Sequence, residues 1–97
     1  MSSGKRVMFI LNPIAGHGLN ENIVAVANET LSKYAIESVF KKTEFAGHAT
    51  TLAAEAVRDK VNLVVCDGGD GTVNATARVL KDSETALAIL PTGYGNG

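Results

Sequence analysis

The 97-residue sequence lacks several features that mark specialised classes of protein. It has no tryptophan, one cysteine and two prolines. Its net charge of −1 gives no electrostatic attraction to nucleic acid or to an anionic membrane. The apolar run from Val7 to Leu11 is too short for the core of a signal peptide or for a membrane span. There is no internal repeat, low-complexity segment or interdomain linker, so we expect one small domain.

The single cysteine, Cys66, ends an apolar run that begins at Val61. A lone thiol at the end of a buried strand indicates a reduced, cytoplasmic protein rather than a disulfide-bonded one. The length is sufficient for one core, but it is near the lower limit for a three-layer α/β fold.

The most informative stretch runs from Val61 to Asn74. Its β-branched residues break into Gly68-Gly69-Asp70-Gly71-Thr72, and a helical pattern follows at once. Glycines leave backbone N–H groups uncovered at the positive end of a helix, where a phosphate binds. Because the Asp70 carboxylate repels phosphate unless a cation lies between them, we expect a phosphate that arrives with Mg²⁺, with Asp70 holding the metal through water. The alternative is an ordinary tight turn, which would need fewer glycines.

Hydrophobic periodicity predicts four strands separated by three helices. The strands are Val7 to Leu11, Ile36 to Lys41, Val61 to Cys66 and Ala86 to Leu90. The second is more polar than the others and suits a sheet edge. The apolar faces of the helices are predicted to be core, and they comprise Ile23, Ala27, Leu31 and Tyr34 in the first helix (about Asn20 to Tyr34), Ala49, Leu52, Ala53, Ala56 and Val57 in the second, and Val73, Ala77 and Leu80 in the third.

This order of elements predicts a three-layer, Rossmann-like parallel sheet with right-handed crossovers. Two strand orders are compatible with it, 2-1-3-4 and 3-2-1-4. In the first order, the loops Asn12 to Gly18 and Gly68 to Thr72 face each other across a crevice between strands 1 and 3. In either order one sheet face carries a single helix, while Leu87 to Leu90 needs cover on both faces. We therefore expect a further segment, or a second copy of the chain, to provide that cover.

Polar residues in the other loops are candidates for ligand contacts. Asn12 could hydrogen-bond a base or ribose, or it could merely fix its own turn. His48, at the start of the second helix, could donate to a phosphate or be structural. Thr72 could cap the third helix or bond a phosphate oxygen, and Asn74 is expected in the first turn of that helix. The loop after the first strand is not a dinucleotide fingerprint, because it lacks the third glycine.

Gly68 to Thr72 resembles the signature of the diacylglycerol kinase, sphingosine kinase and NAD kinase superfamily. Three further stretches are similar to the lipid kinase branch: Asn12-Pro13-Ile14-Ala15-Gly16, Thr43 with Gly47-His48-Ala49, and Leu90-Pro91-Thr92-Gly93-Tyr94. NAD kinase shares the Gly-Gly-Asp-Gly stretch, but the other motifs favour lipid kinases. The resemblance implies an ATP site with Mg²⁺, formed by Asn12, Pro13, Ala15, Gly16, Thr43 (as a hydroxyl donor), Gly68, Gly69, Asp70, Gly71, Thr72, Asn74, Gly93 and Tyr94. The chain departs from the family pattern at Tyr94 (Thr in the family), Gly97 (Asp), Ala75 (Glu) and Asp67 (a small residue).

The resemblance also implies a function, which is transfer of the γ-phosphoryl of ATP to a lipid hydroxyl such as that of diacylglycerol. Similar enzymes continue with a β-sandwich domain that supplies a carboxylate base, so residues 1–97 resemble their nucleotide-binding N-terminal part. We expect no catalytic residue within the 97 residues and no activity from them alone. We also expect a cytoplasmic protein, peripheral at the membrane when it acts on lipid. The alternative to an enzyme is a module that binds a nucleotide but does not catalyse a reaction.

Overall fold

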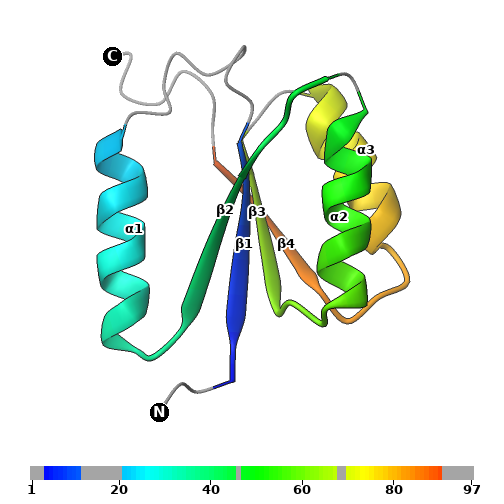
Figure 1. Cartoon of the computed structure of the whole chain (residues 1–97). Coiled ribbons are helices and arrows are strands. Elements are labelled where there is room, and N and C mark those ends of the chain that lie inside the picture. Colours follow the sequence, from blue (N-terminus) through cyan, green and yellow to red (C-terminus); the bar gives the residue numbers. More distant parts are fainter. Residues whose placement is uncertain (1–3, 12–20, 46, 68–69, 91–97) are drawn as a thin grey trace.

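The computed structural model describes residues 4–11, 21–45, 47–67 and 70–90. Strands and helices alternate along the chain (Figure 1). In order they are β1 (Arg6–Leu11), α1 (Glu21–Lys33), β2 (Glu37–Lys42), α2 (His48–Arg58), β3 (Leu63–Asp67), α3 (Asp70–Leu80) and β4 (Ala86–Leu90). None of the helices in these ranges is long and apolar enough to cross a membrane.

The four strands form one parallel sheet in the order β2-β1-β3-β4. Met8 of β1 is paired with Val39 of β2 on one side and with Val64 of β3 on the other. This is the first of the two predicted orders. Because the strands are parallel, their carboxyl ends lie at one edge of the sheet, and the connections diverge on either side of β1 and β3.

Two core clusters lie on opposite faces of the sheet. Figure 1 shows α1 on one side of the sheet and α2 and α3 on the other. Met8, Ile10, Val64 and Cys66 pack against α2 and α3, while Val7, Phe9, Leu11 and Val65 face α1. One face therefore carries a single helix, as predicted. The predicted face of α2 is also confirmed: Ala49, Leu52, Ala53 and Ala56 are buried, and Val57 is half-buried against them.

The predicted core of α1 is right for Ala27 and Leu31, which are half-buried against the sheet, and wrong for Tyr34. Tyr34 is 69% exposed because α1 ends at Lys33. The next residue, Ala35, has a φ of 59°, so the chain turns there and the helical period does not extend to Tyr34.

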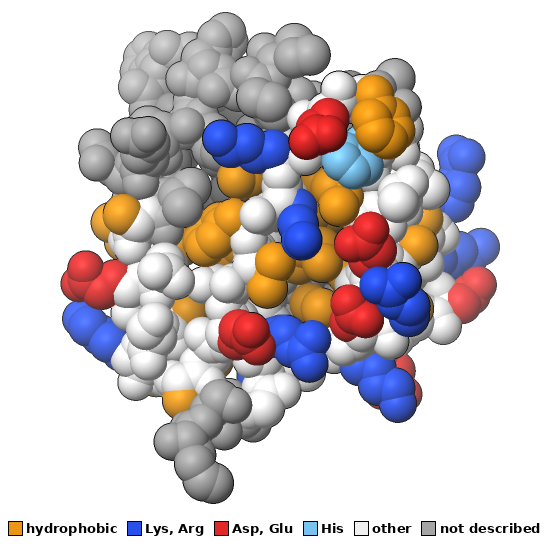
Figure 2. Space-filling model, viewed as in Figure 1, with side chains coloured by type: hydrophobic (Ala, Val, Ile, Leu, Met, Phe, Trp, Pro, Cys, Tyr) orange, Lys and Arg blue, Asp and Glu red, His pale blue; other side chains and the backbone are white. Residues whose placement is uncertain are grey.

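The two edge strands differ in character. Edge strand β2 carries the exposed charges Glu37, Lys41 and Lys42. Between α1 and α2, hydrophobic side chains reach the surface and charged side chains surround them (Figure 2). In β4 the positions before Leu90 are all apolar, and Ile89 is 51% exposed. The cover that the sequence predicts for both faces of β4 is thus incomplete within the described residues.

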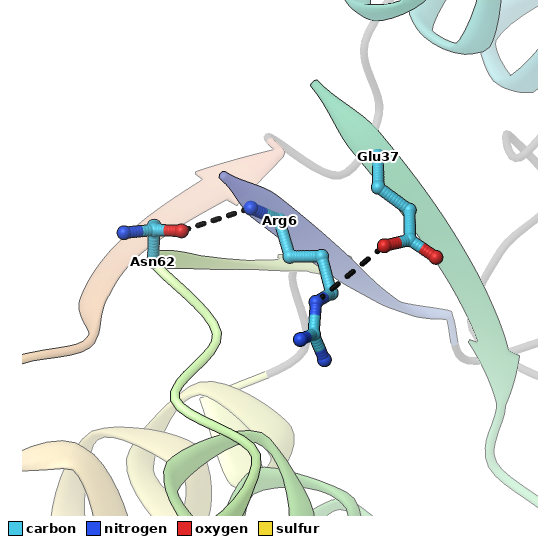
Figure 3. A network of polar contacts seen from close by, with 3 residues as sticks. All are labelled: Arg6, Glu37 and Asn62. Atoms are coloured by element: carbon cyan, nitrogen blue, oxygen red, sulfur yellow. Dashed lines mark hydrogen bonds and ion pairs between the residues drawn. The ribbon is translucent and has the colours of Figure 1, made fainter. Parts of the chain in front are cut away.

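The amino edge of the sheet is held by polar contacts among Arg6, Glu37 and Asn62 (Figure 3). The backbone N–H of Arg6 donates to Oδ1 of Asn62 at 2.8 Å, and the backbone N–H of Asn62 donates to the Arg6 carbonyl at 3.0 Å. Nε of Arg6 lies 3.5 Å from Oε1 of Glu37. These contacts link β2, β1 and the start of β3 away from the edge where a ligand is expected.

Candidate nucleotide-binding edge of the sheet

In the sequence, the predicted ligand residues follow the four strands or lie in the first two turns of α2 and α3. Eight of them lie outside the described residues, namely Asn12, Pro13, Ala15, Gly16, Gly68, Gly69, Gly93 and Tyr94. Their roles stay predictions. The structure does describe Thr43, His48, Gly71, Thr72 and Asn74 at the carboxyl edge of the sheet, together with the backbone of Asp70.

Helix α3 begins at Asp70, and two glycines, Gly68 and Gly69, separate it in the sequence from Asp67, the last residue of β3. The first N–H groups of a helix have no partner within it, so they point toward the carboxyl edge and attract an anion. Gly71 lies in this first turn and is exposed, and a Cβ built on it meets nothing within 4 Å. Packing does not require a glycine there, and its lack of a side chain leaves the turn open to a ligand.

Two predicted positions on α3 need correction. Thr72 is the third residue of the helix, so the prediction that it is the N-cap is wrong. Asn74 is the fifth, which places it one turn beyond Asp70 on the same face rather than in the first turn. Both corrections have one cause, because the helix starts within the glycine stretch instead of after it. A contact from the half-buried Thr72 to phosphate stays a prediction.

Thr43 follows β2 and is bound to the end of β1. Its backbone N–H donates to the carbonyl oxygen of Leu11 at 2.8 Å, and its hydroxyl donates to the same oxygen at 3.3 Å. The residue thus lies beside the segment that begins at Asn12. Its predicted role as a donor to the nucleotide requires the hydroxyl to turn away from Leu11, whereas an acceptor role would not.

His48 is the first residue of α2, and its ring is held on two sides. Its Nδ1 accepts a hydrogen bond from the backbone N–H of Glu44 at 2.9 Å. Its ring stacks on Phe45, with centroids 4.4 Å apart and 14° between the planes. In the neutral ring the proton is then on Nε2, the nitrogen that remains for a phosphate, and that contact stays a prediction.

The sequence reasoning missed the contact between Phe45 and His48. No local pattern in the sequence indicates this contact, because it depends on the sharp turn at Gly47, whose φ in the structure is 86°.

Within the described ranges, no three His, Cys, Asp or Glu side chains are grouped so that they could hold a metal ion. The side chain of Asp70 is not among those described. Magnesium in phosphoryl-transfer sites is commonly held by one or two carboxylates, substrate phosphates and water, so a single carboxylate beside α3 fits that donor set.

A parallel sheet whose helices lie on both faces, with glycines in the sequence between β3 and α3, is the arrangement of α/β domains in the doubly wound class. The chain belongs to the diacylglycerol kinase catalytic domain family, which residues 6–97 match. This confirms the resemblance to the lipid kinase branch.

Individual relatives agree with the family assignment. The chain is 31% identical to a diacylglycerol kinase of Bacillus subtilis over 94 residues, covering 95% of the chain and 31% of that protein. It is 38% identical over 98 residues to a Klebsiella pneumoniae protein named "Probable lipid kinase YegS-like", covering 99% of the chain and 32% of that protein. A crystal structure of a diacylglycerol kinase from Bacillus anthracis superposes with a TM-score of 0.73 at 29% identity, covering 95% of the chain and 34% of that structure. The chain thus spans about a third of the length of these relatives.

Proposed function

We propose that the chain is the nucleotide-binding N-terminal part of an ATP-dependent lipid kinase, which transfers the γ-phosphoryl of ATP to the hydroxyl of a lipid such as diacylglycerol. The observation that carries the proposal is the start of α3 at Asp70, directly after the glycines that follow β3. The family assignment supports the same chemistry. A module that binds a nucleotide without reacting would have the same edge, but the kinase names of the Bacillus subtilis and Klebsiella pneumoniae relatives favour the enzyme.

In this proposal the N–H groups in the first turn of α3 bind phosphate oxygens, and Thr72 adds its hydroxyl. Asp70 holds Mg²⁺ through water, and the metal offsets the charge of the phosphates. Thr43 and Asn12 orient the nucleotide, with Pro13, Ala15, Gly16, Asn74, Gly93 and Tyr94 lining the same site. In the transfer, the acceptor hydroxyl oxygen forms a bond to the γ-phosphorus while the bond to the bridging oxygen breaks.

The proposal assigns no general base and no lipid contact to residues 1–97. It places both in a further β-sandwich domain of the whole protein, and the share of the relatives that this chain spans is consistent with that. The whole protein would be cytoplasmic and would act at the membrane surface as a peripheral protein. We also propose that the chain self-associates through the sheet face that carries a single helix and through the edge strand β4, because β4 is the less protected edge of the sheet.

Calorimetric titration of the chain with ATP, with and without Mg²⁺, tests the phosphate site. Because ATP carries about four negative charges near neutral pH, we expect tighter binding with Mg²⁺. Asp70→Asn should remove this metal dependence. Asp82→Asn is a matched control, since Asp82 is an exposed carboxylate beyond the other end of α3. Equal affinity with and without the metal in the unchanged chain would contradict the proposal.

A further inference from the structure

Two rings stack where the loop after β2 enters α2: Phe45 lies on the loop, and His48 is the first residue of the helix. The ring centroids are 4.4 Å apart and the planes differ by 14°, so the rings lie nearly face to face. The loop connects the edge strand β2 to α2, which packs on the opposite face from α1. The pair is therefore at the carboxyl edge of the sheet.

Hydrogen bonds hold both ends of this loop. At one end, Thr43 is bound to Leu11 through its backbone and its hydroxyl. At the other end, the N–H of His48 donates to the Phe45 carbonyl at 3.1 Å, and Nδ1 of His48 accepts from Glu44. The imidazole is fixed by a hydrogen bond on its edge and by Phe45 on its face. Consequently the Phe45 ring has little freedom to change its orientation without losing the stack.

Phe45 is also the exception among the three phenylalanines. Phe9 is buried, and Phe40 stacks on it within the core that faces α1. Phe45 is 62% exposed, so it gains little from burial. Isolated exposed apolar side chains are common and need no explanation by themselves. Here, however, the exposed ring is backed by a second ring and is located at the edge where this fold binds ligands.

We propose that Phe45 is the platform on which the adenine of the nucleotide stacks, and that His48 positions Phe45 for this contact. A flat aromatic face fixed in advance binds a planar base, and it does so with little loss of conformational entropy. The inference rests on the proposed function, because it requires a nucleotide at this edge. It gives His48 a role that differs from a phosphate contact: His48 acts through Phe45 and does not touch the ligand.

The test is calorimetric titration of the full 97-residue chain with Mg·ATP and, separately, with Mg·tripolyphosphate, which has the phosphates but no base. Phe45→Leu should weaken binding of ATP by about five- to a hundredfold, the range expected for one stacked base. It should leave binding of tripolyphosphate unchanged. Phe45→Tyr retains the ring and should bind ATP like the unchanged chain. His48→Leu should weaken ATP binding alone, and His48→Phe should restore it because a ring again backs Phe45.

Tyr34→Leu is the matched control, since Tyr34 is an aromatic residue 69% exposed in the turn between α1 and β2, on the amino edge. It should leave both ligands unaffected, and thermal melts of all variants should match. Equal ATP affinity in Phe45→Leu would overturn the inference while leaving the proposed function intact. Failure of the unchanged chain to bind either ligand would overturn both.

Two further results would also overturn the inference. Loss of tripolyphosphate binding in His48→Phe would make His48 a phosphate contact. If Phe45→Leu instead reduced binding to phosphatidylcholine vesicles containing diacylglycerol, with ATP binding unchanged, the ring would belong to a lipid surface.

Discussion

Thr43 and Leu11 are joined by two hydrogen bonds that share one acceptor, the carbonyl oxygen of Leu11. The backbone N–H of Thr43 donates at 2.8 Å and its hydroxyl donates at 3.3 Å. Leu11 is the last residue of β1, and Thr43 directly follows β2. The pair therefore fixes the point at which two neighbouring strands pass into the loops of the candidate site.

Replacing Thr43 with valine tests the hydroxyl contact, because valine keeps the shape and the backbone hydrogen bond. We expect the free energy of unfolding to fall by about 0.5–1.5 kcal/mol, which is typical of one hydrogen bond. Since Thr43 is half-buried and the contact is long, the lower part of this range applies. Urea denaturation measures the change, and Thr43→Ser should be closer to the unchanged chain. Unaltered stability in Thr43→Val would mean that the hydroxyl contact contributes nothing to folding.

At the amino edge, Asn62 should matter more than Glu37. Asn62→Ala removes the acceptor for the Arg6 N–H at 2.8 Å, and we expect a loss of about 1 kcal/mol in urea denaturation. Glu37→Gln breaks the ion pair with Arg6, but these side chains are 62% and 42% exposed, so a change near zero is expected. The reverse ranking of the two variants would show that the ion pair, not the side-chain acceptor, holds this edge.

Thr76 and Thr85, both buried, give opposite predictions for the same substitution. Thr76 on α3 is fully buried, and its hydroxyl has no hydrogen-bond partner among the residues that the structure describes. Thr76→Val should therefore raise the free energy of unfolding, by about 1 kcal/mol, because an unsatisfied polar group leaves the core.

Thr85→Val is the matched control for this prediction. Its hydroxyl donates to the carbonyl of Val61 at 2.7 Å, and the substitution leaves that acceptor unpaired. We expect a loss of about 1–3 kcal/mol. Thermal or urea unfolding of both variants would show whether the signs differ. A loss of stability in Thr76→Val would indicate that its hydroxyl has a partner in solution.

Local patterns in the sequence were sufficient to predict the strands and helices, but they did not determine the order of the strands in the sheet. The bounds of β4 coincide with the predicted run from Ala86 to Leu90, because a short apolar strand between polar turns has clear ends. The strand order stayed open between two possibilities. The order depends on which face each helix covers, and periodicity reports only that each helix has one apolar face.

Three residues were placed wrongly from the sequence because local periodicity and capping preference did not decide their positions. Tyr34 continues the apolar period of α1, yet the helix ends at Lys33 and the chain turns at Ala35. Thr72 is a good capping residue, but the glycines allow α3 to start earlier, at Asp70. Thr76 is polar and was left out of the predicted core, although packing of α3 beside α2 buries it completely. In each case tertiary structure, rather than local preference, decides the outcome.

The sequence predicts where the candidate site lies in the fold, but it does not predict the side-chain contacts within it. Glycines after a buried strand located the start of α3, and the parallel sheet located the edge. The stack of His48 on Phe45 was not predictable, since it requires the left-handed turn at Gly47 and the hydrogen bond from Glu44. Such contacts depend on the path of the chain through the loop.

The two edge strands of the sheet, β2 and β4, differ in their protection against pairing with another chain. Exposed edge strands pair with other chains unless charges or other features protect them. On β2 the side chains of Glu37, Lys41 and Lys42 provide that protection. On β4 the run Ala-Leu-Ala-Ile-Leu has no charge, and Ile89 is 51% exposed. We therefore expect the chain to form a dimer or larger species at micromolar concentration, in analytical ultracentrifugation, through β4.

Ile89→Lys introduces a charge at this edge and should shift the sedimenting species toward the monomer. Val26→Lys is the matched control, because Val26 is 64% exposed on α1 and receives the same charge. It should leave the association unchanged, which separates an effect at β4 from a general effect of net charge. If Glu37→Ala increases association further, β2 is also able to pair once a charge is removed. A monomer at all concentrations with a cooperative melt would show that β4 is adequately covered in solution.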